Sequence, residues 1–456
     1  MKKLRKKTTR TVNMTEGPVL KSIIAFSIPL ALMGMLQVFY NAADIIIVGN
    51  FAGDSALASV GATSSSINLI VNLFIGLSVG SSVVISHYYG EENWKGVSSS
   101  VHTSVTLSLI VGILMLFLGL IISEPLLSLI GTPDDIIVGA VTYMKIYCLG
   151  MPASLIFNFV CGILRAVGNT KVPLVISVIA GIINVILNLF FVIVFGLGVV
   201  GVALATIISQ YFSAIVAVKV IMNDSGPIRF QIKNMRIDKK EVIKILKIGI
   251  PSGINSSLFS ISNTLIQSSV NSFGSVAVAG NSAASSIEGL QYAAMNAFSQ
   301  ASLAFVAQNY GAKKFERFRK VIGACIITTS AVSLIFSLIF VPFGKIILHI
   351  YSADNEVLAF AYIKVAILSI SYMICGMNET AMGALRGIGR STTAMIISIF
   401  GICGLRVVWI YTVFEIIRTP ESLFLSYPVS WLITFAVNLL VFKKFVEKIK
   451  KKEITE

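Results

Sequence analysis

The chain has 456 residues, of which 55% are hydrophobic and only 12% are charged, whereas soluble domains carry about 25% charged residues. This composition excludes a soluble globular protein and indicates a polytopic membrane protein. The net charge of +15 does not indicate a nucleic-acid partner, because 31 of the 36 Lys and Arg residues fall in segments that would lie on one side of a membrane. The exceptions are Lys145, Lys345, Lys364, Arg406 and Arg418.

A basic arm, residues 1–19, opens the chain, and we expect it to be cytoplasmic. The apolar run that follows is too long for a cleaved signal peptide and lacks a small-residue cleavage site. From Lys21 to about Asn50 this run carries one charge, that of Asp44. At ~1.5 Å per residue it exceeds the ~30 Å hydrocarbon core of a bilayer, so it is the first predicted span.

A polar stripe follows one face of this first span. Its members occur at helical spacings of three and four, namely Gln37, Tyr40, Asn41 and Asp44. A carboxylate at mid-bilayer costs roughly 2.5–3.5 kcal/mol, and such a group normally faces a cavity or a partner. An Asp near the outer helix end that reaches interfacial water is the plainer interpretation, but the stripe beneath it favours a lined cavity. We therefore expect Asp44 to bind the coupling cation of a transporter.

Twelve apolar segments are expected to cross the membrane, which places both termini in the cytoplasm. The predicted spans are, to within several residues, 20–48, 56–86, 98–122, 136–163, 172–195, 199–221, 242–271, 277–308, 318–341, 357–384, 392–416 and 422–442. They define an N-lobe over residues 20–221, a cytoplasmic linker over 222–241, a C-lobe over 242–442 and a basic cytoplasmic tail over 443–456. The predicted fold class is thus an all-α membrane protein with two six-helix lobes.

The second half of the sequence repeats the first half. IPLALM at Ile28 corresponds to IPSGIN at Ile250, and LRAVGN at Leu164 corresponds to LRGIGR at Leu385. Three further pairs agree, GATSSSI with NSAASSI, YYG with NYG and YMK with YIK, and all five offsets lie between 219 and 222. Because each half has six spans, the halves should be related by an axis along the membrane normal. Such parallel repeats suit alternating access, with a site between the halves.

Charged side chains within the later spans are few. The acids are Glu288 and Glu379, in addition to Asp44, and Arg406 is a candidate partner for one of the three. Lys145 and Lys364 are expected to reach outward to the membrane surface. The nine candidates for a substrate cavity are polar or adaptable side chains of four spans: Gln37, Tyr40, Asn41, Ser256, Asn263, Glu288, Gln291, Met295 and Glu379. Met and aromatic side chains adapt to varied ligands, although packing is their commoner role in membrane spans.

Side-chain amides are frequent in the first half and suggest partners for Asp44. Asn184 and Asn188 are four residues apart and share a helix face, while Asn158 and Thr206 belong to the neighbouring spans. Their oxygens beside a carboxylate suit a hard cation such as Na⁺, or a proton-linked hydrogen-bond network. The alternative interpretation is interhelical hydrogen bonding, which contributes ~0.6 kcal/mol on average. The cation-coupling candidates are therefore these four residues and Asp44.

The signatures of enzymes and of ATP-driven pumps are missing from the sequence. It contains no Walker A motif and no HExxH motif, and its three His residues do not cluster. The five Cys residues fit no zinc or redox spacing and are interpreted as small packing residues. We expect no enzyme activity, no cofactor and no metal apart from Na⁺ at Asp44 if Na⁺ is the coupling ion.

Several stretches resemble the MATE (multidrug and toxic compound extrusion) transporters. They are IPLALMGMLQVFYNAADIIIVG with the GNxxxxxALASVG-like run after it, LRAVGNTKVPL, NVILNLFFVIVFGLGVVGVALAT and LRGIGR. The resemblance covers residues 14–445. It implies two six-helix lobes and export of organic cations or other amphipathic compounds against an inward flow of H⁺ or Na⁺.

The resemblance also implies a first-lobe cation site made by Asp44 with polar residues of spans 4, 5 and 6, which here are Asn158, Asn184 and Thr206. The span 5 pattern of the family often reads N-x-x-L-D, and here it reads NVILN. Asn188 therefore stands where an acid is common, which removes one titratable group and leaves the choice between H⁺ and Na⁺ open. Many relatives also have an acid in span 7 where Phe259 stands here, so a second-lobe site looks absent.

The sequence thus predicts a monomeric antiporter of the cell membrane, whose partners are a small-molecule substrate and membrane lipid. The alternative is a lipid-linked oligosaccharide or polysaccharide flippase of the same superfamily. Such a flippase should carry several Arg or Lys residues inside its spans to bind pyrophosphate, and only Arg406 is a good candidate. A membrane enzyme or receptor would need a catalytic cluster or a sizeable soluble domain, and neither is found. A channel is disfavoured by the paired lobes.

Overall fold

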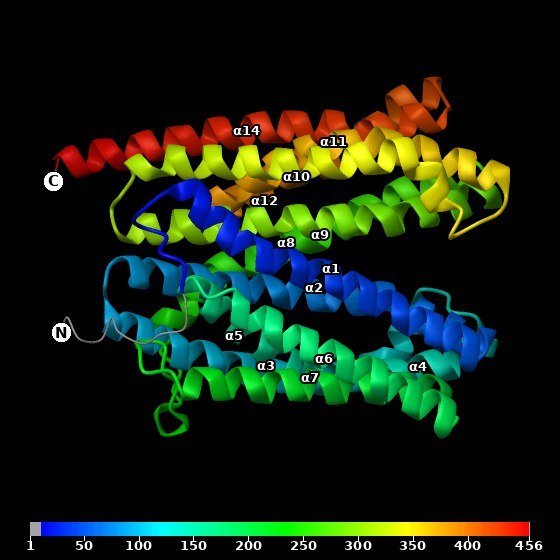
Figure 1. Ribbon diagram of the computed structural model, residues 1–456, viewed down its shortest axis with the longest axis horizontal. Coiled ribbons are helices and arrows are strands. Elements are labelled where there is room, and N and C mark those ends of the chain that lie inside the picture. The colour runs from blue at the N-terminus through cyan, green and yellow to red at the C-terminus, as the bar shows by residue number, and fades with distance from the viewer. Residues whose placement is uncertain (1–10, 456) are drawn as a thin grey trace. The chain divides into compact units, whose positions relative to one another are not determined.

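The computed structural model describes residues 11–455, and within them almost every residue outside short turns is helical (Figure 1). Contacts between residues divide the described chain into two compact units. The first unit contains residues 11–12 and 35–253, and the second contains residues 13–34 and 254–455. The boundaries fall inside the two long helices α1 (Val19–Phe51) and α8 (Lys239–Asn271), so each of these helices contributes to both units. The lobe limits expected from the sequence, residues 20–221 and 242–442, stay a prediction.

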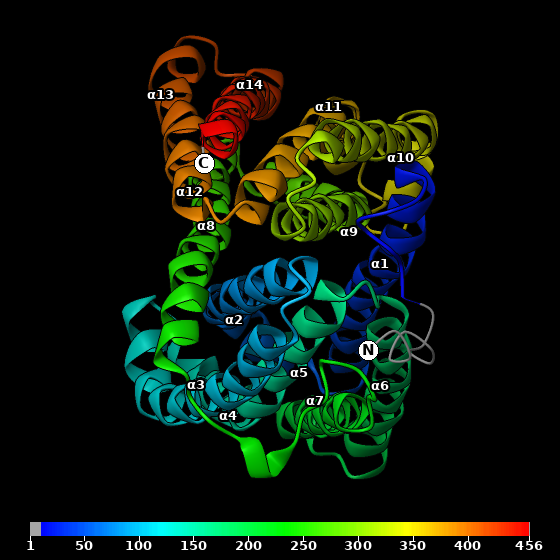
Figure 2. The same cartoon turned by 90° about the vertical axis from the view of Figure 1, so that its left-hand side faces the viewer.

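Between α1 and α8, the first unit contains eight helical segments. They are α2 (Asp54–Gly90), α3 (Trp94–Leu129), α4 (Asp134–Leu149), α5 (Met151–Ala166), α6 (Lys171–Leu189), η2 (Phe190–Val194), α7 (Gly198–Met222) and the 3₁₀ turn η3 (Ile232–Asn234), with the end of α1 and the start of α8 beside them. Helix α5 packs against α2, α3 and α7 (Figure 2). The central apolar cluster includes Ile85, Val101, Val160 and Ile163.

The second unit follows the same plan after α8. Its helices are α9 (Ser275–Gly311), α10 (Glu316–Leu348), α11 (Asn355–Gly387), α12 (Ser391–Ser398), η4 (Ile399–Gly404), α13 (Leu405–Trp409), η5 (Ile410–Phe414) and α14 (Pro420–Thr455). Helix α11 packs against α9, α10 and α14. The apolar cluster of this unit includes Leu368, Tyr372, Phe424 and Trp431.

The twelve predicted spans coincide with twelve helical stretches. In the described residues, nine helices are long and apolar enough to cross a membrane, and the bent pair of α4 and α5 makes ten. Helices α8 and α9 have 33 and 37 residues but are richer in Ser and Asn, which explains their lower hydropathy. The axes of α4 and α5 differ by 49°. At this break a Cβ on Gly150 would lie 2.2 Å from Gln210 Oε1, so the glycine lets α7 approach the bend.

The internal repeat is also visible in the backbone. Three pairs of residues with positive φ are separated by the same number of positions: Gly53 (87°) and Gly274 (91°), Glu92 (54°) and Lys313 (55°), Gly168 (85°) and Gly389 (77°). The turns after α2 and α9 even repeat a hydrogen bond, from Asn93 N to Tyr88 O at 2.9 Å and from Lys314 N to Asn309 O at 2.9 Å. Equivalent sequence motifs therefore fold into equivalent helix ends.

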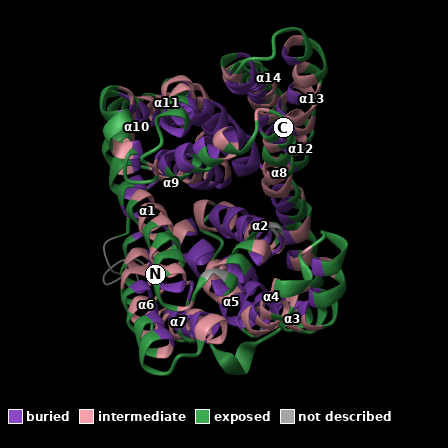
Figure 3. Ribbon diagram, turned by 90° about the vertical axis from the view of Figure 1, so that its right-hand side faces the viewer, coloured by how far each residue is buried: buried purple, intermediate pink, exposed green. Residues whose placement is uncertain are grey.

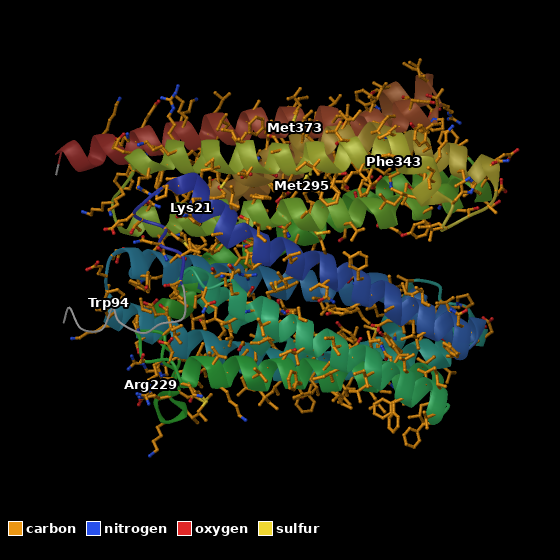
Figure 4. The ribbon with its side chains drawn as sticks, in the orientation of Figure 1. Lys21, Trp94, Arg229, Met295, Phe343 and Met373 are labelled. Carbon is orange, nitrogen blue, oxygen red and sulfur yellow. The ribbon has the colours of Figure 1, made fainter. Side chains whose placement is uncertain are left out.

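Exposed residues lie along the outer faces of the helices (Figure 3), and many of them are large and apolar, as expected for a surface that faces lipid. On α3 they include Phe117, 60% exposed, and Ile121, 74% exposed. On α10 they include Phe343, 54% exposed and labelled in Figure 4, and Ile346, 68% exposed. Polar side chains such as Ser and Thr are buried between the helices instead. This distribution is typical of a multi-pass membrane protein.

Hydrogen bonds link the segment between α7 and α8 to helix α3. Gln231 N donates to His102 Nε2 at 3.1 Å, and Ser99 Oγ donates to Asp238 Oδ2 at 3.3 Å. Ser100 Oγ donates to Glu241 Oε2 at 2.7 Å. The backbone N–H of Lys240, assisted by the Ser99 hydroxyl, holds the pKa of the Asp238 carboxyl below its ordinary value.

Candidate functional site

The polar stripe of α1 lies in the part of that helix that belongs to the first unit. Gln37 and Asn41 are exposed, and the Gln37 amide donates to Asn41 Oδ1 at 3.3 Å. Tyr40 and Asp44 are half-buried, and both form hydrogen bonds with α6. The stripe therefore divides into an exposed amide pair and a pair that docks on a neighbouring helix.

Tyr40 sets the register between α1 and α6. Its hydroxyl donates to the carbonyl of Val178 at 3.3 Å. A Cβ on Gly181 would lie 1.9 Å from Tyr40 Cζ, so the phenol ring lies directly over the α6 backbone, and any larger residue would displace it. Because the two helices run in the same direction, one further turn of α1 brings Asp44 to the level of Asn188.

Asp44, Asn184 and Asn188 are brought together as the sequence predicts. The side-chain nitrogen of Asn188 donates to Asp44 Oδ1, and it lies 3.4 Å from Asn184 Oδ1. Asn184 and Asn188 are buried, at 7% and 0% exposure. Apolar residues including Ile47 and Val192 cluster at this level of the unit. The polar group is thus small and has apolar neighbours on α1 and η2.

One polar atom of this group has no partner. Asn188 Oδ1 is buried and receives no hydrogen bond from any residue that the structure describes. A buried acceptor without a donor costs about 1–3 kcal/mol, so the arrangement favours a ligand that supplies a positive charge or a proton. The carboxylate of Asp44 and the two amide oxygens are hard donors of the kind that alkali and alkaline-earth cations prefer. The residues present therefore fit Na⁺ or H⁺.

The other two predicted coupling residues bond within their own helices. Asn158 Nδ2 donates to Ser154 O at 2.9 Å on α5, and Thr206 Oγ1 donates to Val202 O at 3.0 Å on α7. Their side-chain hydrogen bonds thus go to the backbone rather than to Asp44. Their part in cation coupling stays a prediction.

Two tyrosines of α4 belong to the surroundings of Asp44 and were missed by sequence reasoning. Tyr143 and Tyr147 both lie within electrostatic range of the Asp44 carboxylate. Their rings are 6.2 Å apart, centroid to centroid, and Tyr143 is 8% exposed. The available signal was the repeated motif YMK, in which Tyr143 corresponds to Tyr362, but a tyrosine four residues from another on an apolar helix looks like packing.

In the second unit, Glu288 on α9 is paired with a lysine. Its Oε2 lies 3.2 Å from Nζ of Lys364 on α11, and this ammonium also donates to Ser285 Oγ at 2.8 Å. Both residues are buried, at 7% and 3% exposure. The expectation that Lys364 reaches the membrane surface was therefore wrong, because a buried carboxylate offers it a stronger partner than interfacial water.

The remaining predicted cavity residues of this unit make helix contacts. Gln291 is fully buried and donates to Ser333 Oγ at 3.1 Å and to Ser369 O at 3.0 Å. Met295 is 1% exposed within the apolar cluster. Of the other three, Ser256 is half-buried, and Asn263 accepts a hydrogen bond from Arg406 at 3.4 Å. Glu379 is 5% exposed and lies within electrostatic range of Arg386. Their assignment to a substrate cavity stays a prediction.

Three multidrug resistance or export proteins are similar in sequence to most of this chain. "Probable multidrug resistance protein YoeA" of Bacillus subtilis (strain 168) is 28% identical over 460 residues, which cover 98% of this chain and 97% of that protein. "Probable multidrug resistance protein YpnP" of the same organism is 26% identical over 397 residues, with 87% and 89% coverage. "Multidrug export protein MepA" of Staphylococcus aureus (strain MSSA476) is 22% identical over 388 residues, with 84% and 85% coverage.

Solved structures of MATE transporters share the fold. A crystal structure of MATE in complex with MaL6 superposes with a TM-score of 0.91 at 22% identity, covering 97% of this chain and all 100% of that chain. A multidrug resistance MATE family transporter of the MOP superfamily in an outward-facing conformation gives the same TM-score and identity, with 98% and 100% coverage. The predicted fold class, twelve helices in two lobes, is thereby confirmed.

A family model described as MatE matches residues 29–190 and again residues 251–412. The two matches fall on the two halves of the internal repeat. These two matches, together with the fold shared over nearly the whole length, show that the chain belongs to the MatE family of membrane transporters.

Proposed function

We propose that this transporter is an antiporter that exports organic cations and other amphipathic small molecules in exchange for inward-moving H⁺ or Na⁺. It acts as a monomer in the cell membrane with both termini in the cytoplasm. The multidrug resistance and multidrug export names of its relatives support an export role. The asymmetric distribution of Lys and Arg along the sequence supports the orientation.

The observation that carries the proposal is the group formed by Asp44, Asn184 and Asn188. An acid inside an apolar helix is costly and is kept there for a functional reason. Here it is joined to a buried amide whose oxygen lacks a partner. A cation or proton would neutralise the acid and satisfy that oxygen at the same time, so this group is the best place in the described chain for a coupling ion.

The proposed coupling step is a change of partners at Asp44. In the ionised state its carboxylate accepts from the Asn188 amide. When Asp44 takes a proton or Na⁺ from the outer side, the charge is neutralised, and the Asn188 side chain can reorient to offer its oxygen. Helix α1 carries Pro29, which removes one backbone hydrogen bond and permits a bend. Occupation of Asp44 then shifts α1 between straight and bent forms and biases the outward- and inward-open states.

The rival flippase function predicts several uncompensated cations inside the spans. Three cationic side chains are buried in the described part of the chain, Lys364, Arg386 and Arg406. Lys364 is neutralised by Glu288, and Arg386 lies near Glu379. Only Arg406 remains without an acid, which is too little positive charge to bind a pyrophosphate.

The test is a transport assay with purified protein in liposomes. A pH gradient and a Na⁺ gradient are imposed separately, and the uptake of an organic cation dye is measured in each case. We expect one of the gradients to drive uptake by the wild type and Asp44→Asn to abolish this response. The matched control is Glu124→Gln, the same acid-to-amide change at a side chain that is 69% exposed, and it should transport normally. Gradient-driven uptake by Asp44→Asn at the wild-type rate would remove Asp44 from the mechanism.

A further inference from the structure

Arg406 is the most deeply buried cation in the described chain. It lies on the five-residue helix α13 in the second unit and has 0% exposure. Its guanidinium lies over the ring of Tyr427, 4.0 Å from the centroid, and 5.7 Å from the centroid of Trp431, both on α14. The side chain is thus enclosed between α8, α13 and α14.

The partners of this guanidinium are neutral oxygens. Nε donates to Ser430 Oγ at 3.3 Å, and Nη1 donates to Ser262 Oγ at 3.0 Å and to Asn263 Oδ1 at 3.4 Å. The third nitrogen, Nη2, is buried and has no acceptor among the described residues. Nearby, the indole N–H of Trp431 is also buried without an acceptor. Two N–H groups of this cluster, Arg406 Nη2 and the Trp431 indole, therefore lack a hydrogen-bond acceptor within the described part of the chain.

The charge of Arg406 is also uncompensated. None of its nitrogens lies within 4.0 Å of a carboxylate oxygen in residues 11–455, so the expectation that Arg406 pairs with a membrane acid was wrong. The acids that were its candidate partners are near other groups, Glu288 with Lys364 and Glu379 with Arg386. A water molecule could satisfy an N–H group, but only an anion supplies the missing counter-charge in a low-dielectric interior.

The helix around Arg406 is irregular on both sides. The π-helical segments Ile399–Gly404 and Ile410–Phe414 flank α13 directly. Such widened turns are uncommon and occur frequently at functional sites, where they redirect a side chain or loosen the backbone. A ligand that enters this cluster thus meets a helix that is less rigidly bonded than its neighbours.

We propose that Arg406 and Trp431 bind the carboxylate of the transported substrate, and that the substrates of this protein include aromatic or amphipathic carboxylates. The inference rests on the proposed export function and names one substrate class for it. A carboxylate carries a single negative charge, which matches the single uncompensated guanidinium, and its two oxygens can accept from Nη2 and from the indole N–H. The rings of Tyr372 and Tyr427 each lie 5.4 Å from that of Trp431, centroid to centroid, so the rest of the molecule would have aromatic neighbours beside the guanidinium.

The test is equilibrium dialysis of the full-length protein in detergent against 2-naphthoate and its neutral counterpart 2-naphthamide, with protein-free micelles as the blank. Wild-type protein should bind naphthoate more tightly than naphthamide. Arg406→Gln should weaken naphthoate binding by at least about 10-fold, the factor expected for a charge-assisted hydrogen bond, and leave naphthamide binding unchanged. The assay needs no ion gradient, so it can fail or succeed independently of coupling at Asp44.

A second variant guards against a folding defect in Arg406→Gln. Trp431→Phe keeps an aromatic ring and removes only the unpartnered N–H, and it should weaken naphthoate binding by about 10-fold. Trp409→Phe is the matched control, because its indole N–H already donates to Ser422 O at 2.9 Å, and it should bind like the wild type. Equal binding of naphthoate and naphthamide by the wild type would overturn the proposal. So would displacement of naphthoate by one phosphatidylglycerol per protein, which would assign the site to a lipid phosphodiester.

Discussion

Asn188 donates its side-chain N–H to the carboxylate of Asp44, at a position where the resembling family pattern often has a second acid. An amide can stabilise the ionised Asp44 without any cation, whereas two adjacent carboxylates repel each other unless a cation or proton lies between them. This group therefore has a single negative charge to neutralise, and we expect it to bind a cation less tightly than two adjacent acids would.

Asn188→Asp tests this relationship. The variant loses the amide donor and places two carboxylates in contact, so we expect it to bind Na⁺ at least about 10-fold more tightly than the wild type. The measurement is the rise in apparent unfolding temperature when choline chloride is replaced by NaCl at constant ionic strength, since a ligand that binds the folded state stabilises it. Asn72→Asp, on α2, is the control for a new acid outside the group of Asp44, Asn184 and Asn188. A Na⁺-dependent rise no larger than in the wild type would contradict the expectation.

The contact between Tyr40 and Gly181 gives a prediction about stability. Gly181→Ala places a methyl group where the Tyr40 ring lies, and overpacking of this kind costs about 1–3 kcal/mol. We expect a lower apparent unfolding temperature in detergent. Gly61→Ala is the matched control, because it adds the same methyl group to helix α2 with nothing within 4 Å of it, and it should be neutral or slightly stabilising. The double variant Gly181→Ala/Tyr40→Ala should recover part of the loss, and no recovery would show that the ring is not the obstacle.

Much of the fold could be predicted from the sequence because membrane spans are local features. A run of apolar residues long enough to cross the bilayer is a helix whatever surrounds it, and the repeat then orders the helices into two equivalent sets. The grouping of Asn184 and Asn188 also follows from local spacing, since residues four apart share a face. Their link to Asp44 could not follow from spacing within one helix, and it depended on the frequency of amides in the first half and on the family resemblance.

What could not be predicted depends on how helices rotate and approach one another. Lys364 looks like a residue that reaches the membrane surface until α9 brings Glu288 to within 3.2 Å. Arg406 looks like a partner for an acid, yet its neighbours are hydroxyl groups and aromatic rings. Nothing in the spacing of a single helix reports which residue of another helix will face it. Long-range pairings of charged groups were therefore the least predictable part of this molecule.

The pKa of Asp238 predicts a pH dependence in the segment between α7 and α8. The folded protein lowers this pKa below its unfolded value of about 3.9, so the ionised carboxylate stabilises the folded segment above that pH, and the contribution is lost as pH falls through the lowered value. Hydrogen exchange of residues 238–242, corrected for the intrinsic rate, should be constant from pH 7 to 5 and accelerate below about pH 4. Asp238→Asn should exchange faster at neutral pH, and Asp135→Asn, on α4, should not. A step between pH 5 and 7 would point to another group.

The ion pair of Glu288 and Lys364 predicts a strongly non-additive pair of variants. Lys364→Met leaves a buried carboxylate without a counter-charge, and loss of one partner of a buried pair costs about 3–5 kcal/mol. Glu288→Gln/Lys364→Met removes both charges and should recover most of the stability, as measured by apparent unfolding temperatures. Lys145→Met is the control, since its pair with Glu124 is 3.9 Å long and exposed, and such pairs contribute about 0–1 kcal/mol. If the double variant is no more stable than Lys364→Met, the two charges do not compensate each other in the folded protein.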